Sequence, residues 1–314
     1  MTGKPLRYLE AVAQTGAISA AARQLFVSPP SLSQFVKRLE EDNGIVIFDR
    51  SSGPWKLTLE GKYFLDCERR IEAILRERHQ YFEDLKTGLS GELRVGSTQY
   101  RSETLLSRIL PVFAERYPGI RVRITELTTQ ELVSAAGNGE VDCAFVISRM
   151  MTKELVGVEV YQENVLLAVP RKLAARGGMK VPGPGRPPFP RISFSKVADL
   201  PFIIMKSGQA FREYFEILCA RYGVKPAVAL ETQSILTVPA LVSAGLGAAL
   251  VPDTLCPELG EKEVEFFSLG GDLPVNTLSL VRRRGKYVPR ACQLFFETAY
   301  TVLKGSGGLR SADF

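Results

Sequence analysis

The sequence predicts an α/β protein in three parts: a small N-terminal helical domain with a β-hairpin, a long linking helix, and a two-lobed α/β domain. Three observations predict this arrangement. Residues 1–58 carry three short helical patterns, followed by two short apolar runs around a Ser-Ser-Gly-Pro turn. Residues 64–85 repeat apolar side chains with the alternating three- and four-residue spacing of a coiled coil. Strand and helix patterns alternate from residue 91 onward.

Composition restricts the class of protein before any motif is considered. The 314 residues are 45% hydrophobic and 24% charged, as in ordinary globular domains, and 40 Lys+Arg against 34 Asp+Glu give a net charge of +6. None of the five cysteines lies at a CxxC spacing, and the single histidine, His79, excludes metal sites that need two histidines. No apolar run reaches the roughly 18 residues of a membrane span. We therefore expect a cytoplasmic protein with no cofactor, no metal and no membrane contact.

The N-terminal helices have identifiable starts and ends. Ser19 is a suitable N-cap for a helix over residues 20–25, and Ser28 caps a third helix with Pro29 at its first position. Gly44 ends that helix. Apolar runs at residues 45–48 and 55–57 then predict two short strands. Three helices followed by a hairpin are the order of a winged helix-turn-helix.

The third helix is expected to bury one face and expose the other. Its buried stripe, at positions i, i+3, i+4 and i+7, is Leu32, Phe35, Val36 and Leu39. The other face suits the DNA major groove, because short polar groups reach base edges while Lys and Arg meet phosphates. The residues expected to contact DNA are Ser28, Pro30, Ser31, Ser33, Gln34, Lys37 and Arg38, with Arg50 and Lys56 at the hairpin. From the stripe alone, a merely solvated surface helix is the alternative.

Several stretches together resemble one protein family. SAAARQLFVSPPSLSQFVKRLEEDNGIVIFDR (19–50) and LTLEG (57–61) are similar to the N-terminal half of LysR-type transcriptional regulators. GELRVG (91–96) resembles the first strand of their sensor domain, and ETQSILTVPALVSAGLGAALVP (231–252) resembles a helix and strand of its second lobe. The resemblance implies a DNA-binding regulator rather than an enzyme, with a sensor of periplasmic-binding-protein architecture. This chain departs from the family at Pro29, where a polar residue is usual, and in a hairpin turn without the usual basic residues.

The expected domains follow from these patterns and from the resemblance. We expect a winged helix-turn-helix over residues 1–58, a dimerisation helix over 59–90 and an effector-binding domain over 91–314. Its lobe I comprises residues 91–163 and 268–314, and its lobe II comprises residues 164–267. The strand–helix rhythm of this domain predicts parallel sheets.

The expected partners are double-stranded promoter DNA, a small-molecule effector, and further copies of the chain. About 28 helical residues would extend about 42 Å, and the apolar stripe of such a helix needs a partner. The resemblance implies that a twin helix covers it in a homodimer and that sensor domains join dimers into a homotetramer. Packing of the stripe against its own chain is the alternative.

Polar residues after several expected strands predict a ligand site. In open α/β sheets, ligands collect at the carboxyl ends of strands, near helix N-termini. Hydroxyls, backbone N–H groups and one lysine favour a small anion there, such as a carboxylate. The expected effector-binding residues are Ser97, Thr98, Gln99, Tyr100, Ser148, Lys206, Ser207, Thr232 and Ser234. Helix capping is the alternative role for each residue alone, and a solute-binding protein or an enzyme on the same two-lobed fold is the alternative function.

Overall fold

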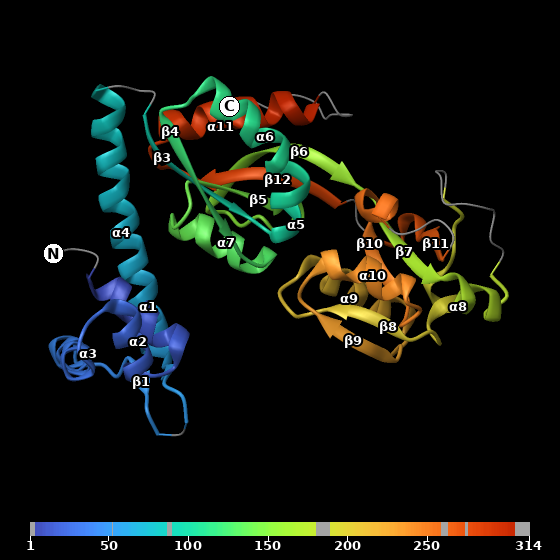
Figure 1. The fold of residues 1–314 in the computed structure, drawn as a ribbon, viewed down its shortest axis with the longest axis horizontal. Coiled ribbons are helices and arrows are strands. Elements are labelled where there is room, and N and C mark those ends of the chain that lie inside the picture. The colour runs from blue at the N-terminus through green and yellow to red at the C-terminus, as the bar shows by residue number, and fades with distance from the viewer. Residues whose placement is uncertain are drawn as a thin grey trace. The chain divides into compact units, whose positions relative to one another are not determined.

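The computed structural model describes residues 4–51, 53–86, 90–179, 189–258, 263–273 and 276–304. The chain forms two compact units, one made mainly by residues 1–88 and the other mainly by residues 89–314 (Figure 1). No helix in the described part of the chain is long and apolar enough to cross a membrane.

The N-terminal unit contains three short helices, a small hairpin and one long helix. Their bounds are α1 Lys4–Thr15, α2 Ile18–Leu25, α3 Pro29–Asn43, β1 Phe48–Asp49, β2 Lys56–Leu57 and α4 Leu59–Lys86. The two strands pair antiparallel, with Phe48 opposite Leu57. One apolar core joins α1, α2, α3 and the start of α4, with Leu9, Val12, Leu32 and Val36 fully buried in it.

Helix α3 confirms the pattern predicted for it. The Ser28 hydroxyl accepts a hydrogen bond from the Ser31 N–H at 3.3 Å, and Gly44 ends the helix with φ = +65°. Phe35, half-buried, packs edge-on against Tyr8 with ring centroids 4.9 Å apart. The apolar stripe therefore faces the core, and the polar face of the helix is left on the surface.

Two local predictions in this unit are wrong. Helix α2 begins at Ile18 rather than after Ser19, and its N-cap Ala17 provides no side-chain hydrogen bond. The hairpin strands are two residues each, shorter than the apolar runs predicted. The Thr58 N–H donates to the Ile47 carbonyl at 3.0 Å, so Ile47 is held by the turn before α4 instead of by a strand partner.

The turn between α2 and α3 holds Phe26 in a left-handed conformation, with φ = +57°. Backbone hydrogen bonds from Phe26 N–H to the Arg23 carbonyl and from Val27 N–H to the Ala22 carbonyl close a Schellman motif. The same pair of bonds closes α3, with Gly44 at the left-handed position. Every other positive-φ residue in the described segments is a glycine. Since the Phe26 side chain is 92% exposed, packing does not offset this backbone strain.

Replacing Phe26 by Gly is therefore expected to stabilise the N-terminal unit by about 1 kcal/mol. Trp55 is the single tryptophan of the chain and lies in the same unit, so its fluorescence during urea unfolding measures this change. Phe26→Ala is the control, because it removes the ring but keeps a Cβ in the left-handed conformation. A midpoint that rises equally in both variants would mean that the exposed ring, and not backbone strain, is the destabilising feature.

The second unit is built on a five-stranded sheet and a second group of strands. The five-stranded sheet has the order β4-β3-β5-β12-β6, and helices α6 and α11 cover one face while α7 lies on the other (Figure 1). The bounds of these elements are β3 Gly91–Ser97, β4 Ile120–Glu126, β5 Cys143–Ile147, β6 Leu155–Glu163, β12 Asn276–Arg283, α5 Gln99–Arg101, η1 Ser102–Leu106, α6 Ser107–Arg116, α7 Thr129–Asn138, η2 Ser148–Met150 and α11 Arg290–Lys304. We call this part the first lobe.

The second lobe contains a three-stranded sheet, β10-β7-β11, and a strand pair, β8-β9. A bridge between Phe202 and Ala248 links the pair to the edge of the three-stranded sheet. The bounds are β7 Val165–Pro170, β8 Phe202–Met205, β9 Val228–Thr232, β10 Ala249–Pro252, β11 Val264–Ser268, α8 Arg171–Arg176, α9 Ala210–Tyr222, α10 Val238–Ser243, η3 Phe194–Val197, η4 Ile235–Thr237, η5 Asp253–Glu258 and η6 Gly270–Asp272. The chain passes between the lobes twice, from β6 to β7 and from β11 to β12.

The prediction of parallel sheets is correct for only some of the strand pairs. Strand β12 runs antiparallel to both β5 and β6, and β7 runs antiparallel to both β10 and β11. The reason lies in the two passages between the lobes: a strand that returns from the other lobe re-enters the sheet from its opposite end. Parallel pairing is kept where a helix connects neighbouring strands within one lobe, as for β3 with β4 and β8 with β9.

Candidate DNA-binding surface and ligand cavity

The polar face of α3 lies on the surface of the N-terminal unit. Of the residues predicted to contact DNA on this helix and its cap, Ser33 is half-buried, and the exposed ones are Ser28, Pro30, Ser31, Gln34, Lys37 and Arg38. Lys37 forms an ion pair with Glu41 at 3.5 Å, and both side chains are exposed. Such a pair contributes little to stability, so the Lys37 ammonium can exchange this partner for a phosphate.

Glu40, near the end of α3, holds the hairpin against the helix. Its Oε1 accepts hydrogen bonds from the N–H groups of Ile47 and Phe48, at 2.9 and 3.2 Å. Its Oε2 forms an ion pair with Arg50, and the Arg50 guanidinium lies 4.4 Å from the centre of the Trp55 ring. Arg50, predicted to contact DNA, thus also has a structural role. Lys56, predicted with it, is exposed on β2.

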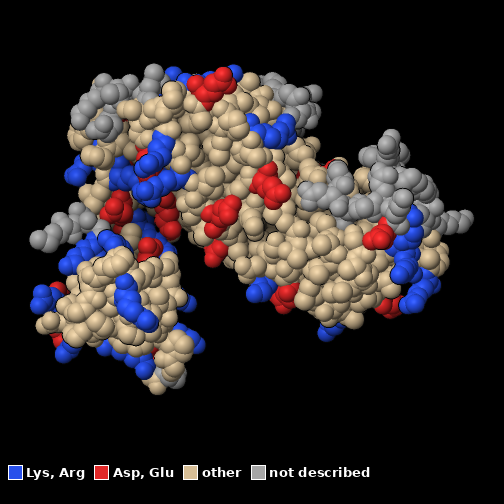
Figure 2. Space-filling view, in the orientation of Figure 1, with Lys and Arg blue, Asp and Glu red and all other residues tan. Residues whose placement is uncertain are grey.

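Positive and negative side chains nearly balance in the N-terminal unit. Residues 1–66 contain eight Lys+Arg and seven Asp+Glu. In Figure 2, Lys and Arg lie as separate groups around this unit rather than as one continuous basic surface. Net charge alone therefore gives this unit little attraction to DNA.

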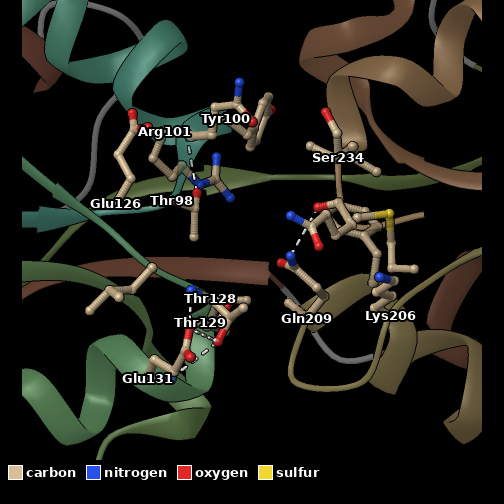
Figure 3. A pocket seen from close by; sticks show the side chains of 18 of the residues that line it. Thr98, Tyr100, Arg101, Glu126, Thr128, Thr129, Glu131, Lys206, Gln209 and Ser234 are labelled. Carbon is tan, nitrogen blue, oxygen red and sulfur yellow. Dashed lines mark hydrogen bonds between the residues drawn. The ribbon is translucent and has the colours of Figure 1, made fainter. Parts of the chain in front are cut away.

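A cavity of about 510 Å³ lies between the two lobes of the second unit. Its first-lobe wall comes from the start of α5 and the start of α7, and its second-lobe wall from the segments around β8, α9 and η4 (Figure 3). Its polar and charged lining residues are Thr98, Gln99, Tyr100, Arg101, Glu126, Thr128, Thr129, Glu131, Lys206, Ser207, Gln209, Gln233 and Ser234. Apolar side chains such as Phe145, Ile147 and Phe211 complete it. A volume of this size fits a small metabolite.

Side-chain caps position the helix starts at the cavity. The Thr98 hydroxyl accepts a hydrogen bond from the Arg101 N–H at 3.2 Å. Thr128 and Glu131 form a capping box at the start of α7: Glu131 accepts from the Thr128 N–H at 2.9 Å, and the Thr128 hydroxyl accepts from the Glu131 N–H at 3.4 Å. The Glu131 carboxylate is therefore held at the start of its own helix, where it keeps its negative charge beside the cavity.

Arg101 is the charged lining residue with the deepest burial, since it is only 5% exposed. Its guanidinium Nη2 donates to both carboxylate oxygens of Glu163, the longer bond being 2.9 Å. Burial raises the pKa of Glu163, and the Arg101 charge opposes that increase. The pair joins α5 to the last residue of β6, where the chain leaves the first lobe.

Six of the nine residues predicted to bind an effector line the cavity: Thr98, Gln99, Tyr100, Lys206, Ser207 and Ser234. The other three are outside the lining and have partners of their own. Ser97 is fully buried and its hydroxyl donates to the Thr98 carbonyl at 3.2 Å, while Thr232 accepts from the Ser234 N–H at 3.2 Å. Ser148 bonds to the Thr277 carbonyl and to Ser279, at 3.0 and 2.8 Å.

Sequence reasoning missed Arg101 and the capping box at Thr128. The capping box has a sequence signal, Thr-x-x-Glu before an apolar run, that could have revealed it. Arg101 has none, because its partner Glu163 is 62 residues away in the chain.

Comparison with known protein families decides the identity of the fold. Residues 4–62 match the bacterial regulatory helix-turn-helix protein, lysR family, and residues 86–304 match the LysR substrate binding domain. The chain belongs to the LysR family. It is therefore a LysR-type DNA-binding transcriptional regulator, as the resemblance of its motifs implied.

Relatives and solved structures agree with this assignment along the whole chain. The uncharacterized HTH-type transcriptional regulator YcgK of Bacillus subtilis (strain 168) is 29% identical over 313 residues, which cover 96% of this chain and 94% of YcgK. A probable RuBisCO transcriptional regulator of Trieres chinensis is 28% identical, with 96% and 97% covered. The crystal structure of CbnR, a LysR family transcriptional regulator, has the same fold, with a TM-score of 0.64 at 23% identity over 97% and 100% of the two chains.

Proposed function

We propose that this LysR-type regulator binds double-stranded promoter DNA as a homodimer or homotetramer, and that a small anionic effector in the inter-lobe cavity modulates the binding. The observation that carries the effector proposal is the cavity itself, which has hydroxyls, helix starts and Lys206 on its walls. Backbone N–H groups at helix N-termini favour negative charge. For regulation, the effector must bind one arrangement of the paired DNA-binding units better than another.

The proposed DNA contacts lie on α3, its N-cap and the hairpin. They are Ser28, Pro30, Ser31, Ser33, Gln34, Lys37, Arg38 and Lys56, together with Arg50, which also pairs with Glu40. The support for them is that α3 turns its apolar stripe inward and leaves the polar face open. Short hydroxyl and amide groups near the helix start would read base edges, and the cations would meet phosphates.

Helix α4 supports the proposed dimer. Large apolar side chains are exposed along it, namely Leu59, Tyr63, Ile71, Ile74, Tyr81, Phe82 and Leu85. Near its start, Leu59, Tyr63 and Phe64 line an open apolar groove of about 470 Å³ together with Ile45. An apolar surface of this length is costly in water, and a second α4 would cover it. Two copies of α3 would then meet two half-sites of one operator.

A Lys37→Ala substitution tests the DNA surface. Loss of one phosphate contact is expected to weaken binding and to reduce the slope of log K against log salt by about one. The measurement is a salt titration of binding to duplexes that the wild-type chain selects from a random pool. Lys153→Ala, which removes an exposed lysine from the second unit, should leave the slope unchanged. Equal slopes in all three proteins would remove Lys37 from the phosphate contacts, and failure to select any duplex would contradict the DNA proposal.

A further inference from the structure

Lys4 holds its charged group against the surface of α3. It lies in the first turn of α1 and is exposed. Its ammonium is 5.3 Å from the centre of the Tyr8 ring and 5.5 Å from the centre of the Phe35 ring. A cation over aromatic rings at these distances is attracted by their electrons. The two rings therefore hold the lysine side chain beside α3, the helix to which Phe35 belongs.

Phe35 marks one edge of the polar face of α3. Because an α-helix has about 3.6 residues per turn, Ser31 and Arg38 lie one turn before and one turn after Phe35 on the same side of the helix. Both of these neighbours are exposed. Lys37 lies about 160° round the helix axis from Phe35, at the other edge of the polar face. Lys4 and Lys37 therefore place positive charge at opposite edges of the face proposed to read DNA.

The charge of Lys4 is available to a phosphate. Lys4 pairs with no carboxylate in the described part of the chain, whereas Lys37 shares its charge with Glu41 at 3.5 Å. The ring contacts occupy one side of the ammonium, and its three N–H donors leave the other side free to bond. A helix in the major groove has a phosphate backbone along each of its two sides, one from each strand. Cations at the two edges of α3 are thus placed to meet different strands.

We infer that Lys4 is a further DNA contact, that Tyr8 and Phe35 position it, and that it meets a phosphate on the strand opposite the one met by Lys37. This inference rests on the proposed DNA surface of α3 and adds to it a residue from α1. The rings have a role beyond packing, because a lysine side chain ordered before DNA arrives loses less entropy when the contact forms.

Salt titrations of a Lys4→Gln variant test the contact, using the duplexes that the wild-type chain selects from a random pool. The slope of log K against log salt is expected to fall by about one in Lys4→Gln and by about two in Lys4→Gln/Lys37→Ala. Lys4→Arg keeps a cation that also stacks on aromatic rings, so it should retain the wild-type slope. Lys153→Ala is again the control in the second unit.

The outcomes separate this inference from the proposed DNA surface. If Lys37→Ala lowers the slope and Lys4→Gln does not, the proposed surface stands and Lys4 is not part of it. If neither variant lowers the slope, the proposed surface is wrong and the inference is overturned with it. A role of Lys4 confined to packing α1 against α3 would lower the urea midpoint of Lys4→Gln and leave the slope unchanged, which also overturns the inference.

A matched pair of variants tests the positioning by the rings. Tyr8→Leu removes one ring but keeps an apolar side chain, and it is expected to weaken binding about threefold with little change in slope. Tyr8→Phe keeps the ring and should bind DNA like the wild-type chain. Equal affinities of the two variants would show that the ring does not position Lys4.

Neutral methylphosphonates, placed one at a time along each strand of one half-site, locate the phosphates. The substitution that no longer weakens binding in Lys4→Gln identifies the phosphate met by Lys4, and the same comparison in Lys37→Ala identifies the phosphate met by Lys37. We expect the two phosphates on opposite strands. Two phosphates on the same strand would overturn the placement of Lys4 and Lys37 at opposite edges of the groove.

Discussion

An Ile74→Glu variant is expected to be monomeric and to bind a promoter duplex with two half-sites about 100-fold more weakly than the wild-type chain. Ile74 is 52% exposed on α4, midway along the face that also carries Tyr63, Ile71 and Phe82. In the proposed dimer this face is covered by the twin helix. A carboxylate placed there must either lose its water without gaining a partner or keep the helices apart.

The loss of affinity follows from the two-site geometry. When one half-site is bound, a dimer holds its second α3 at a high effective concentration near the other half-site, and a monomer loses this advantage. Sedimentation gives the mass, and titration of one duplex with both half-sites gives the affinity. Ile74→Leu keeps the site apolar and should remain dimeric. A dimeric Ile74→Glu protein with unchanged affinity would show that α4 is not the dimer interface.

Gly61→Ala is expected to destabilise the N-terminal unit by about 3 kcal/mol, since a side chain forced into a packed site displaces the backbone around it. Gly61 is buried in the first turn of α4. A Cβ added there would lie 2.0 Å from the Ile47 carbonyl oxygen and 2.8 Å from its carbon, and both of these atoms belong to the backbone. The same carbonyl accepts the Thr58 N–H, so it cannot move away without breaking the turn into α4.

The consequence reaches DNA binding, because Ile47 also donates its N–H to Glu40 at the end of α3. Urea unfolding followed by Trp55 fluorescence measures the loss of stability, and DNA binding at 37 °C should fall with it. Gly137→Ala is the matched control: Gly137 lies in α7 with nothing within 4 Å of an added Cβ, so alanine should stabilise that helix by up to about 1 kcal/mol. A Gly61→Ala protein as stable as the wild type would contradict the close approach to Ile47.

Strand β6 shows why some elements could not be found from local pattern. It spans Leu155–Glu163, contains Gly157, and changes register against β12 between Leu278 and Ser279. The irregularity interrupts the alternation of buried and exposed residues that identifies a strand in a sequence. Its partner β12 is buried almost throughout, so the pairing becomes evident only when the two segments are brought together.

Two neighbouring hydroxyl residues that look equivalent in the sequence differ in whether they line the cavity. Ser97 is the last residue of β3 and Thr98 follows it, yet Thr98 lines the cavity and Ser97 is fully buried. The difference is the alternation of side chains along β3, continued into the turn that follows it. Which side of β3 and of the turn after it points into the cavity depends on how the second lobe is placed against the first.

By itself, the amino-acid sequence determined the elements whose causes are local: the capped helix α3 with its inward apolar stripe, the long helix α4, and the strand–helix rhythm of the second unit. Periodicity, capping and turn chemistry act over a few residues, so these elements can be predicted without a partner segment. Only the tertiary structure decided the antiparallel placement of β12, the Arg101–Glu163 ion pair and the set of residues around the cavity. Each of these joins groups that are distant in the chain, and their interaction free energy exists only once folding has brought them into contact.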